Sequence, residues 1–185
     1  MQEKIRRQIE ASIEAKRKLP AADIGAAAMV LIVALKSGHK VLLAGNGGSA
    51  ADCQHIAGEL VGRFKKERKA LPAISLTTDT SIITALANDY GSESIFSRQV
   101  EAHGAKGDVL LALSTSGSSP NILKAAEAAK KRGMKVVGLT GIKGAKLKSL
   151  SDVCITAASD DTPRIQECHT MAAHIICGLI EDALF

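Results

Sequence analysis

Aromatic residues are scarce in this sequence. The 185-residue chain has no Trp, one Tyr and three Phe, which together make up 2% of its residues. Proteins that bind single-stranded nucleic acid usually stack bases on aromatic side chains, so this composition does not suit that function. The apolar 46% of the chain is supplied mostly by Ala, Ile, Leu and Val, which suits closely packed helices and buried parallel strands.

Cysteine pairs and long apolar runs are also missing. The four cysteines include no CxxC pair, so neither a disulfide framework nor a zinc ribbon is expected. The longest apolar stretch, 24–35, is shorter than the roughly 20 residues that cross a bilayer, and its alanines predict a buried helix. The first residues, MQEKIRRQIE, are charged and unlike a signal sequence. We therefore expect reduced thiols, a cytoplasmic location and no membrane contact.

The net charge of +5 favours an anionic ligand. Lys and Arg fall in separate clusters, at 4–18, 63–69 and 130–148, without interleaved aromatic residues. No zinc-finger or RNA-recognition motif accompanies them, so we expect a small anion and no nucleic acid.

Two helices are predicted before any strand. In the first, about 2–18, Ile5, Ile9 and Ile13 are spaced four apart and form one apolar stripe on a charged helix. The second runs through the Ala-rich segment to Ser37 and Gly38. The stripe needs a partner, so these helices, about 2–37, are expected at a subunit interface.

From His39 onward, short apolar runs alternate with helical segments. Helices are expected near 49–61, 81–87, 94–103, 121–132 and 163–184. The apolar runs are KVLLAG, LPAISL, DVLLALS, MKVVGLT and DVCITA. This alternation predicts an α/β fold with a parallel five-stranded sheet and helices on both faces. No repeat or linker interrupts it, so residues 1–185 are expected to form one domain whose core is about 39–185.

Two loops have compositions that suit a phosphate. One, Gly45-Asn46-Gly47-Gly48-Ser49, follows the first strand and opens a helix; the other, Ser114-Thr115-Ser116-Gly117-Ser118-Ser119, follows the third. Strand ends that lead into helix starts collect anions, because free N–H groups and the helix dipole point there. Ordinary turn chemistry could explain either loop alone, but two such loops in one sheet favour a ligand site.

The first loop also matches the dinucleotide pattern G-x-G-x-x-A through Gly45, Gly47 and Ala50. Asp79 could then bind a ribose, although it lies farther along than the usual spacing of about 20 residues. The Ser/Thr loop would have no role in that interpretation. The P-loop pattern is absent, which disfavours hydrolysis of a nucleoside triphosphate.

Polar residues are spaced four apart on two of the expected helices. His55 and Glu59 share one face of the helix after the first loop, and Gln166, Thr170 and His174 share one face of the last helix. Together they could bind Zn²⁺ or serve, without metal, as a general acid and base. In the metal-free case Glu59 would be the base and His174 its partner, because histidine gives and takes protons near neutral pH.

The other histidines, His39, His103 and His169, are expected to be structural or surface groups, His169 pointing away from His174. The cysteines should pack as small apolar groups. Cys53 lies close to His55 in sequence and is the thiol whose reactivity is worth testing.

Four stretches, AGNGGSAADCQHIAGELVGRF, ALANDYG, LSTSGSSPNIL and TPRIQECHTMAAHIICGLIE, occur in order along the chain. With the two leading helices, they resemble the phosphoheptose isomerase branch of the SIS (sugar isomerase) proteins over nearly the whole length. The resemblance implies a three-layer SIS sandwich, a homotetramer, and conversion of sedoheptulose 7-phosphate to D-glycero-D-manno-heptose 7-phosphate. That reaction is the first step toward ADP-heptose and the heptose of lipopolysaccharide core.

The resemblance also implies roles for individual residues. The sugar would contact Asn46, Gly47, Gly48, Glu59, Asn88, Asp89 and Gln166. The phosphate would contact Ser114, Thr115, Ser116 and Ser119. One zinc ion per subunit would be held by His55, Glu59, Gln166 and His174. Glu59 and His174 would be the catalytic pair, and Arg63 resembles an active-site arginine of the family, although a surface ion pair explains it equally well.

Two alternatives belong to other functional classes. One is a related SIS protein that binds the bacterial replication initiator and shares the Gly-rich loop and the R-I-Q-E stretch. That protein lacks the acid–base pair, whereas this chain has both Glu59 and His174, which favours the enzyme. The other is a sugar-phosphate sensor, which stays open because binding and catalysis use most of the same residues.

Overall fold

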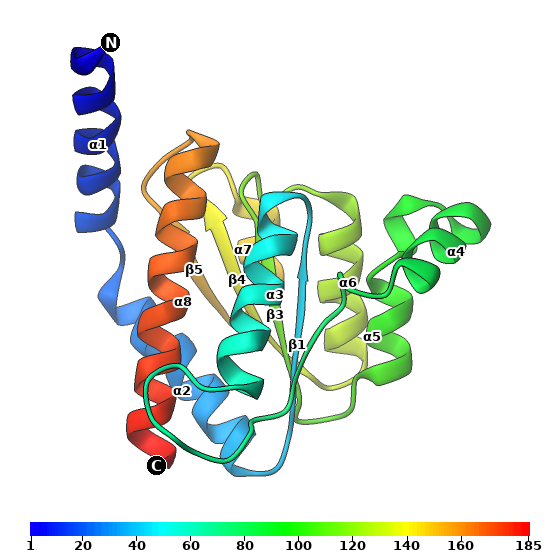
Figure 1. Ribbon diagram of the computed structural model, residues 1–185. Helices are drawn as coiled ribbons and strands as arrows, with labels where there is room; N and C mark the ends of the chain where they lie inside the picture. Colours follow the sequence, from blue (N-terminus) through cyan, green and yellow to red (C-terminus); the bar gives the residue numbers. More distant parts are fainter.

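The computed structural model describes residues 1–185 and has a parallel sheet between two layers of helices (Figure 1). Strands β1 and β3 are buried along their whole length, as expected where helices cover both faces of a parallel sheet. The strand order is β2-β1-β3-β4-β5. The strands are β1 Val41–Gly45, β2 Ala73–Ser75, β3 Val109–Ser114, β4 Lys135–Gly141 and β5 Val153–Ala157. The predicted α/β fold with five parallel strands is confirmed.

Helices follow most strands and supply the outer layers. They are α1 Gln2–Arg17, α2 Ala21–Lys36, α3 Gly48–Val61, α4 Thr80–Tyr90, η1 Ser92–Ser94, α5 Ser97–His103, α6 Pro120–Lys131, α7 Ala145–Leu150 and α8 Thr162–Leu184. Proline is the first residue of α6 and the second of α8, where its missing N–H removes no helical hydrogen bond.

Alternate residues of β1, β3 and β4 enter two separate cores. Leu43 and Leu111 face the core that α2, α3 and α8 complete, whereas Leu42 and Leu110 face the core under α5, α6 and α7. Because side chains alternate along a strand, each short apolar run serves both layers. The first core places α3 and α8 side by side on one face of the sheet (Figure 1).

The strand order reverses between β1 and β3, and both loops with phosphate-binding composition follow these two strands. Because β1 and β3 are hydrogen-bonded neighbours, their carboxyl ends lie side by side. Ligands of open parallel sheets bind at such a reversal point. The topology therefore brings the two loops to one edge of the sheet.

Three details differ from the sequence-based expectation. Helix α7 was not predicted; Leu147 is its one buried residue, so it has no apolar face. Helix α4 extends to Tyr90, beyond the expected 81–87, and includes Asn88 and Asp89. Residues 92–94 form a separate 3-10 turn before α5. Helix α3 ends at Val61, as expected, so Arg63 lies beyond the helix.

Helix α1 projects beyond the sheet along α8 (Figure 1). Ala15 is its one buried residue, and Ile5 and Ile9 are each 52% exposed. No single helix is long and apolar enough to span a membrane; α1 and α2 meet that criterion only as a pair, bent by 65° at the break between them.

Candidate active site

The loop after β3 gathers hydroxyl groups around one glycine. Ser114 is buried at the end of the strand, and its Oγ lies 3.1 Å from Ser119 Oγ and accepts a hydrogen bond from the Gly117 N–H at 3.1 Å. Ser116 Oγ accepts hydrogen bonds from the N–H and hydroxyl of Ser118. Gly117 has a φ of +61°, and a Cβ there would meet Thr140 and Gly144. This tight turn presents N–H and O–H donors at the start of α6, as an anion site requires.

An amide pair links this loop to the Gly-rich loop after β1. Asn46 and Asn121 donate to each other's side-chain oxygen at 2.9 Å in both directions. Gly47 adopts a φ of +56°, and a Cβ on Gly48 would collide with the amide of Gln166. The Gly-rich loop is thus positioned from one side by α6 and from the other by α8.

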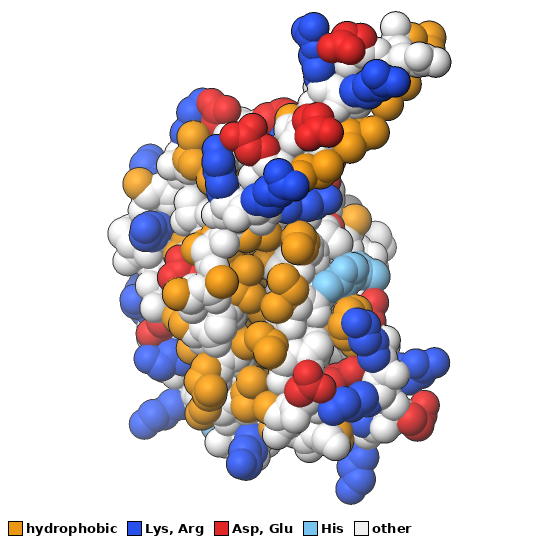
Figure 2. Space-filling model, turned by 90° about the vertical axis from the view of Figure 1, so that its left-hand side faces the viewer, with side chains coloured by type: hydrophobic (Ala, Val, Ile, Leu, Met, Phe, Trp, Pro, Cys, Tyr) orange, Lys and Arg blue, Asp and Glu red, His pale blue; other side chains and the backbone are white.

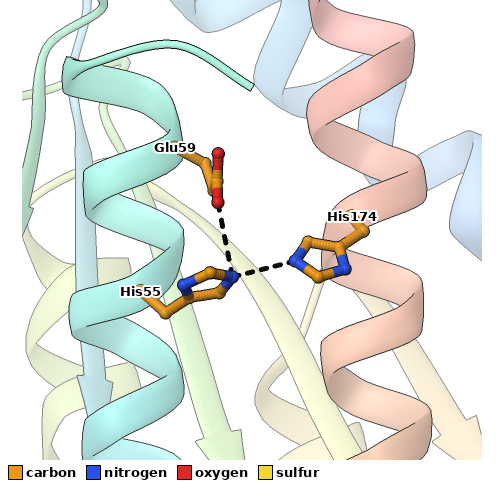
Figure 3. Close-up of side chains that lie close together, drawn as sticks. All are labelled: His55, Glu59 and His174. Atoms are coloured by element: carbon orange, nitrogen blue, oxygen red, sulfur yellow. Dashed lines mark hydrogen bonds and ion pairs between the residues drawn. The ribbon is translucent and has the colours of Figure 1, made fainter. Parts of the chain in front are cut away.

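His55, Glu59 and His174 converge between α3 and α8 (Figure 3). His55 Nε2 lies 2.8 Å from His174 Nε2 and 3.4 Å from Glu59 Oε1. Spacing by four residues predicted that His55 and Glu59 share a face, and this is confirmed. The meeting with His174 comes from the packing of α8 against α3. The side chain of Glu59 is 19% exposed, so the carboxylate is partly withdrawn from water yet reachable.

A second polar contact joins the same two helices. Thr170 donates to Asp52 Oδ1 at 3.2 Å, and the other carboxylate oxygen of Asp52 is buried without a partner. Burial raises the pKa of Asp52, partly offset by the Thr170 hydrogen bond and by His55. Asp52 lies three residues before His55, so helical spacing could have identified it. Gln166, Thr170 and His174 all face α3, as predicted from their spacing.

The three converging groups suit a zinc ion. The candidate ligand atoms of His55, Glu59 and His174 lie within 4.8 Å of one another, and two imidazoles with one carboxylate are a common zinc ligand set. Gln166, the fourth expected ligand, instead lies against Gly48 at the Gly-rich loop.

Other predicted site residues lie apart from this cluster. Asn88 donates to Asp89 at 2.7 Å, and both are exposed on α4, which Figure 1 shows on the far side of the molecule from α8. Arg63 forms an exposed ion pair with Glu67 at 3.6 Å. Their proposed roles in the site are not supported by any contact within one chain.

The structure also decides between roles for three polar groups outside the cluster. Asp79 accepts the N–H of Ile82 and caps α4, which disfavours the dinucleotide interpretation. Cys53 is fully buried, and burial raises the pKa of its thiol, which agrees with the prediction that the cysteines pack as small apolar groups. His169 is buried with neither ring nitrogen hydrogen-bonded, and is therefore a core group.

Sequence spacing gave no sign of Phe64, whose ring stacks on His174 with centroids 5.4 Å apart and planes inclined by 22°. Phe64 follows the end of α3 in an irregular segment, so no periodicity indicated which way its side chain points.

Comparison with known proteins identifies the family. Residues 5–141 match the SIS domain family. The phosphoheptose isomerase of Rhodospirillum rubrum is 56% identical over 161 residues, which cover 87% of this chain and 86% of the relative. The chain belongs to the phosphoheptose isomerase family. The member from Aneurinibacillus thermoaerophilus is 50% identical over an alignment of 190 residues that covers 100% of this chain and 96% of the relative.

The solved structure of a phosphoheptose isomerase from Neisseria gonorrhoeae has the same fold. It matches with a TM-score of 0.93 and 41% identity, covering 98% of both chains. The SIS arrangement implied by the motifs is therefore confirmed over nearly the whole phosphoheptose isomerase chain.

Proposed function

We propose that the protein converts sedoheptulose 7-phosphate to D-glycero-D-manno-heptose 7-phosphate, an intramolecular aldose–ketose isomerisation at the start of ADP-heptose synthesis. The observation that carries this proposal is the convergence of Glu59 on α3 with His174 on α8. The same chain has a hydroxyl-rich loop at the carboxyl end of β3. A carboxylate and an imidazole are the base and acid that an enediol mechanism needs.

Each group has a defined task. Glu59 removes the C1 proton of the ketose, and the electron pair forms the C1–C2 double bond of an enediol. His174 gives a proton to the C2 oxygen and accepts the proton of the C1 hydroxyl. Glu59 then returns its proton to C2, which completes the aldose with no net change in protons. A single base that acts on two adjacent carbons must reach both of them. Glu59 is only partly buried, so its carboxylate is open to the substrate.

The phosphate is the anchor of the substrate. Ser114, Thr115, Ser116 and Ser119 would donate to its oxygens at the N-terminus of α6, and the helix dipole would favour its charge. Asn46, Gly47 and Gly48 would contact the sugar, with Asn121 holding the Asn46 amide in place. Gln166 would reach the sugar from α8, since it already lies against Gly48.

We further propose that His55, Glu59 and His174 hold one zinc ion per subunit, with Gln166 as a fourth ligand after a change of side-chain conformer. A bound zinc ion would supply a Lewis acid for the sugar oxygens.

The four cysteines are free and buried, which agrees with a reducing cytoplasm.

A homotetramer is proposed because apolar side chains remain uncovered on α1, α2 and α8. Figure 2 shows them gathered on one face of the molecule. The exposed apolar residues of these elements are Ile5, Ile9, Met29, Val33, Met171, Ile175, Leu179 and, just after α8, Phe185. Contiguous patches of this kind mark association surfaces. Asn88 and Asp89 lie on α4, away from α8 in Figure 1, and we propose that they contact the sugar in a neighbouring subunit's site.

The direct test is incubation of the purified protein with sedoheptulose 7-phosphate, with and without added Zn²⁺. We expect an aldose heptose 7-phosphate in the zinc-loaded sample. Absence of aldose under both conditions, with binding of the sugar phosphate retained, would instead support the sensor alternative. Binding to the replication initiator without turnover would support the other SIS class.

A further inference from the structure

One ion pair is almost completely withdrawn from water. The side chains of Arg68 and Glu181 are 1% and 2% exposed, with Nε and Oε1 3.0 Å apart. Every other ion pair in the chain has at least one partner that is more than a quarter exposed. A buried ion pair adds little net stability compared with packed apolar side chains. The role of this pair is therefore sought in the backbone groups that Arg68 and Glu181 bind.

Glu181 holds the segment that follows α3. Its carboxylate accepts the backbone N–H groups of Phe64, Lys65 and Lys66, each at 2.9 Å, in addition to Arg68. Burial alone would raise the pKa of Glu181, but these hydrogen bonds outweigh it and lower the pKa to about 2. The carboxylate therefore stays charged and keeps residues 64–66 against α8.

Arg68 holds the end of α3 itself. Its guanidinium donates to the carbonyl oxygens of Glu59 at 2.7 Å, Leu60 at 2.8 Å and Gly62 at 3.2 Å. The last carbonyls of a helix have no partner within the helix, so Arg68 fastens the turn that carries Glu59. Through Glu181 this turn is tied to α8, the helix that carries His174.

Phe64 completes the connection. Its N–H is bound by Glu181, and its ring lies nearly parallel to the His174 imidazole, whose Nε2 points toward His55. Stacking restricts rotation of the imidazole about its side-chain bonds.

We propose that Arg68, Glu181 and Phe64 are positioning residues for the isomerisation. The ion pair fixes the end of α3 relative to α8, and Phe64 holds the His174 ring in its working orientation. The inference rests on the proposed function for the roles of Glu59 and His174, and adds the groups that set their geometry.

The first test replaces the stacking ring. We expect Phe64→Leu to bind sedoheptulose 7-phosphate with a KM within about twofold of wild type and a kcat lower by about tenfold or more, because small misplacements of reacting groups cost rate. Phe64→Tyr, which keeps the ring, should restore most of the kcat. A control for lost aromatic bulk is Phe96→Leu, in the core on the opposite face of the sheet; it should lower stability without lowering kcat.

The second test removes the ion pair without leaving a charge unpaired. The double variant Arg68→Met/Glu181→Leu leaves no unpaired charge but removes the acceptor of the N–H groups of residues 64–66, so its fold is checked by circular dichroism. In the folded variant we expect a reduced kcat with little change in KM. Wild-type kcat in this variant, or in Phe64→Leu, would overturn the proposal. A raised KM with unchanged kcat would also overturn it.

A crystal structure of Phe64→Leu gives a readout that does not depend on turnover. We expect the His174 imidazole to adopt another rotamer or to be spread over two. An unchanged imidazole would reject the positioning role even if the wild-type protein were inactive. Conversely, an inactive wild type with a displaced ring in Phe64→Leu would count against the isomerase and leave the positioning role standing.

Discussion

Glu59 is the group whose replacement separates binding from chemistry most cleanly. Glu59→Gln keeps the size and hydrogen-bonding outline of the side chain but removes its ability to take a proton. We expect kcat to fall by about 10³-fold, within the range that a general base contributes, while the substrate still binds in calorimetry. The same substitution at Glu67, whose side chain is 93% exposed, should leave kcat unchanged. Substantial turnover by Glu59→Gln would assign the base elsewhere.

His169 should make the protein sensitive to acid. Burial lowers the pKa of His169 from 6.5 to about 4. The unfolded chain therefore takes up a proton at this position below pH 6.5, whereas the folded chain does so only near pH 4. As pH falls through this window, the free energy of unfolding should decrease by up to about 3 kcal/mol from this residue.

Denaturant titrations between pH 7 and pH 4.5 test the histidine prediction. We expect the free energy of unfolding to fall less steeply for His169→Leu than for wild type at the same protein concentration. Replacement of the exposed His103 by Gln should leave the wild-type slope. Equal slopes for His169→Leu and wild type would show that His169 is not the acid-sensitive group.

At the scale of elements, the turn between β3 and α6 depends on Gly117. Gly117→Ala places a Cβ against Gly144 and Thr140 in a backbone with φ of +61°, so the loop must shift away from its donor arrangement. We expect KM to rise by about tenfold, equivalent to one hydrogen bond to a charged group. Gly38→Ala has a similar φ, +80°, with open space around the Cβ. It should cost only about 1 kcal/mol of stability, and an equal change of KM in both variants would contradict the loop argument.

An element could be predicted from the sequence when its own residues show a regular pattern of apolar and polar side chains. The runs that became β1, β3 and β4 were recognisable because nearly every residue in them is buried. The four-residue spacing of His55 and Glu59 predicted a shared helix face. Helix α7 was invisible, since one buried leucine sets no period. The edge strand β2 covers only residues 73–75 of its apolar run; Pro72 before it has no N–H to donate, and only its carbonyl pairs with β1, through the Val41 N–H.

Contacts between segments far apart in the sequence could not be predicted from local residue patterns. Arg68 and Glu181 are individually ordinary charged residues, and only the packing of α8 beside α3 withdraws both from water. The Asn46–Asn121 pair likewise joins two loops that meet because β1 and β3 are neighbours. The family resemblance implied roles for Asn46, Glu59 and His174. It did not indicate the residues that hold them in position.

At the scale of the whole molecule, the apolar side chains exposed on α1 have no packing partner within one chain. The helix has 16 residues and one buried side chain, and isolated helices of this length are marginal in water. In a tetramer the stripe that contains Ile5 and Ile9 would pack against neighbouring subunits and stabilise α1. Its apolar residues are thus better explained by association than by folding of the monomer.

Ile9→Glu tests the association directly. The side chain is 52% exposed in one chain, so the substitution should be tolerated by the monomer fold, but a carboxylate buried between subunits is costly. We expect sedimentation to show a tetramer for wild type and for Glu10→Gln, and smaller species for Ile9→Glu with an unchanged circular dichroism spectrum. Activity should fall with the tetramer if Asn88 and Asp89 of one subunit contact the sugar in another. A monomeric wild type would contradict the proposed assembly, whereas a tetrameric Ile9→Glu would place the interface away from α1.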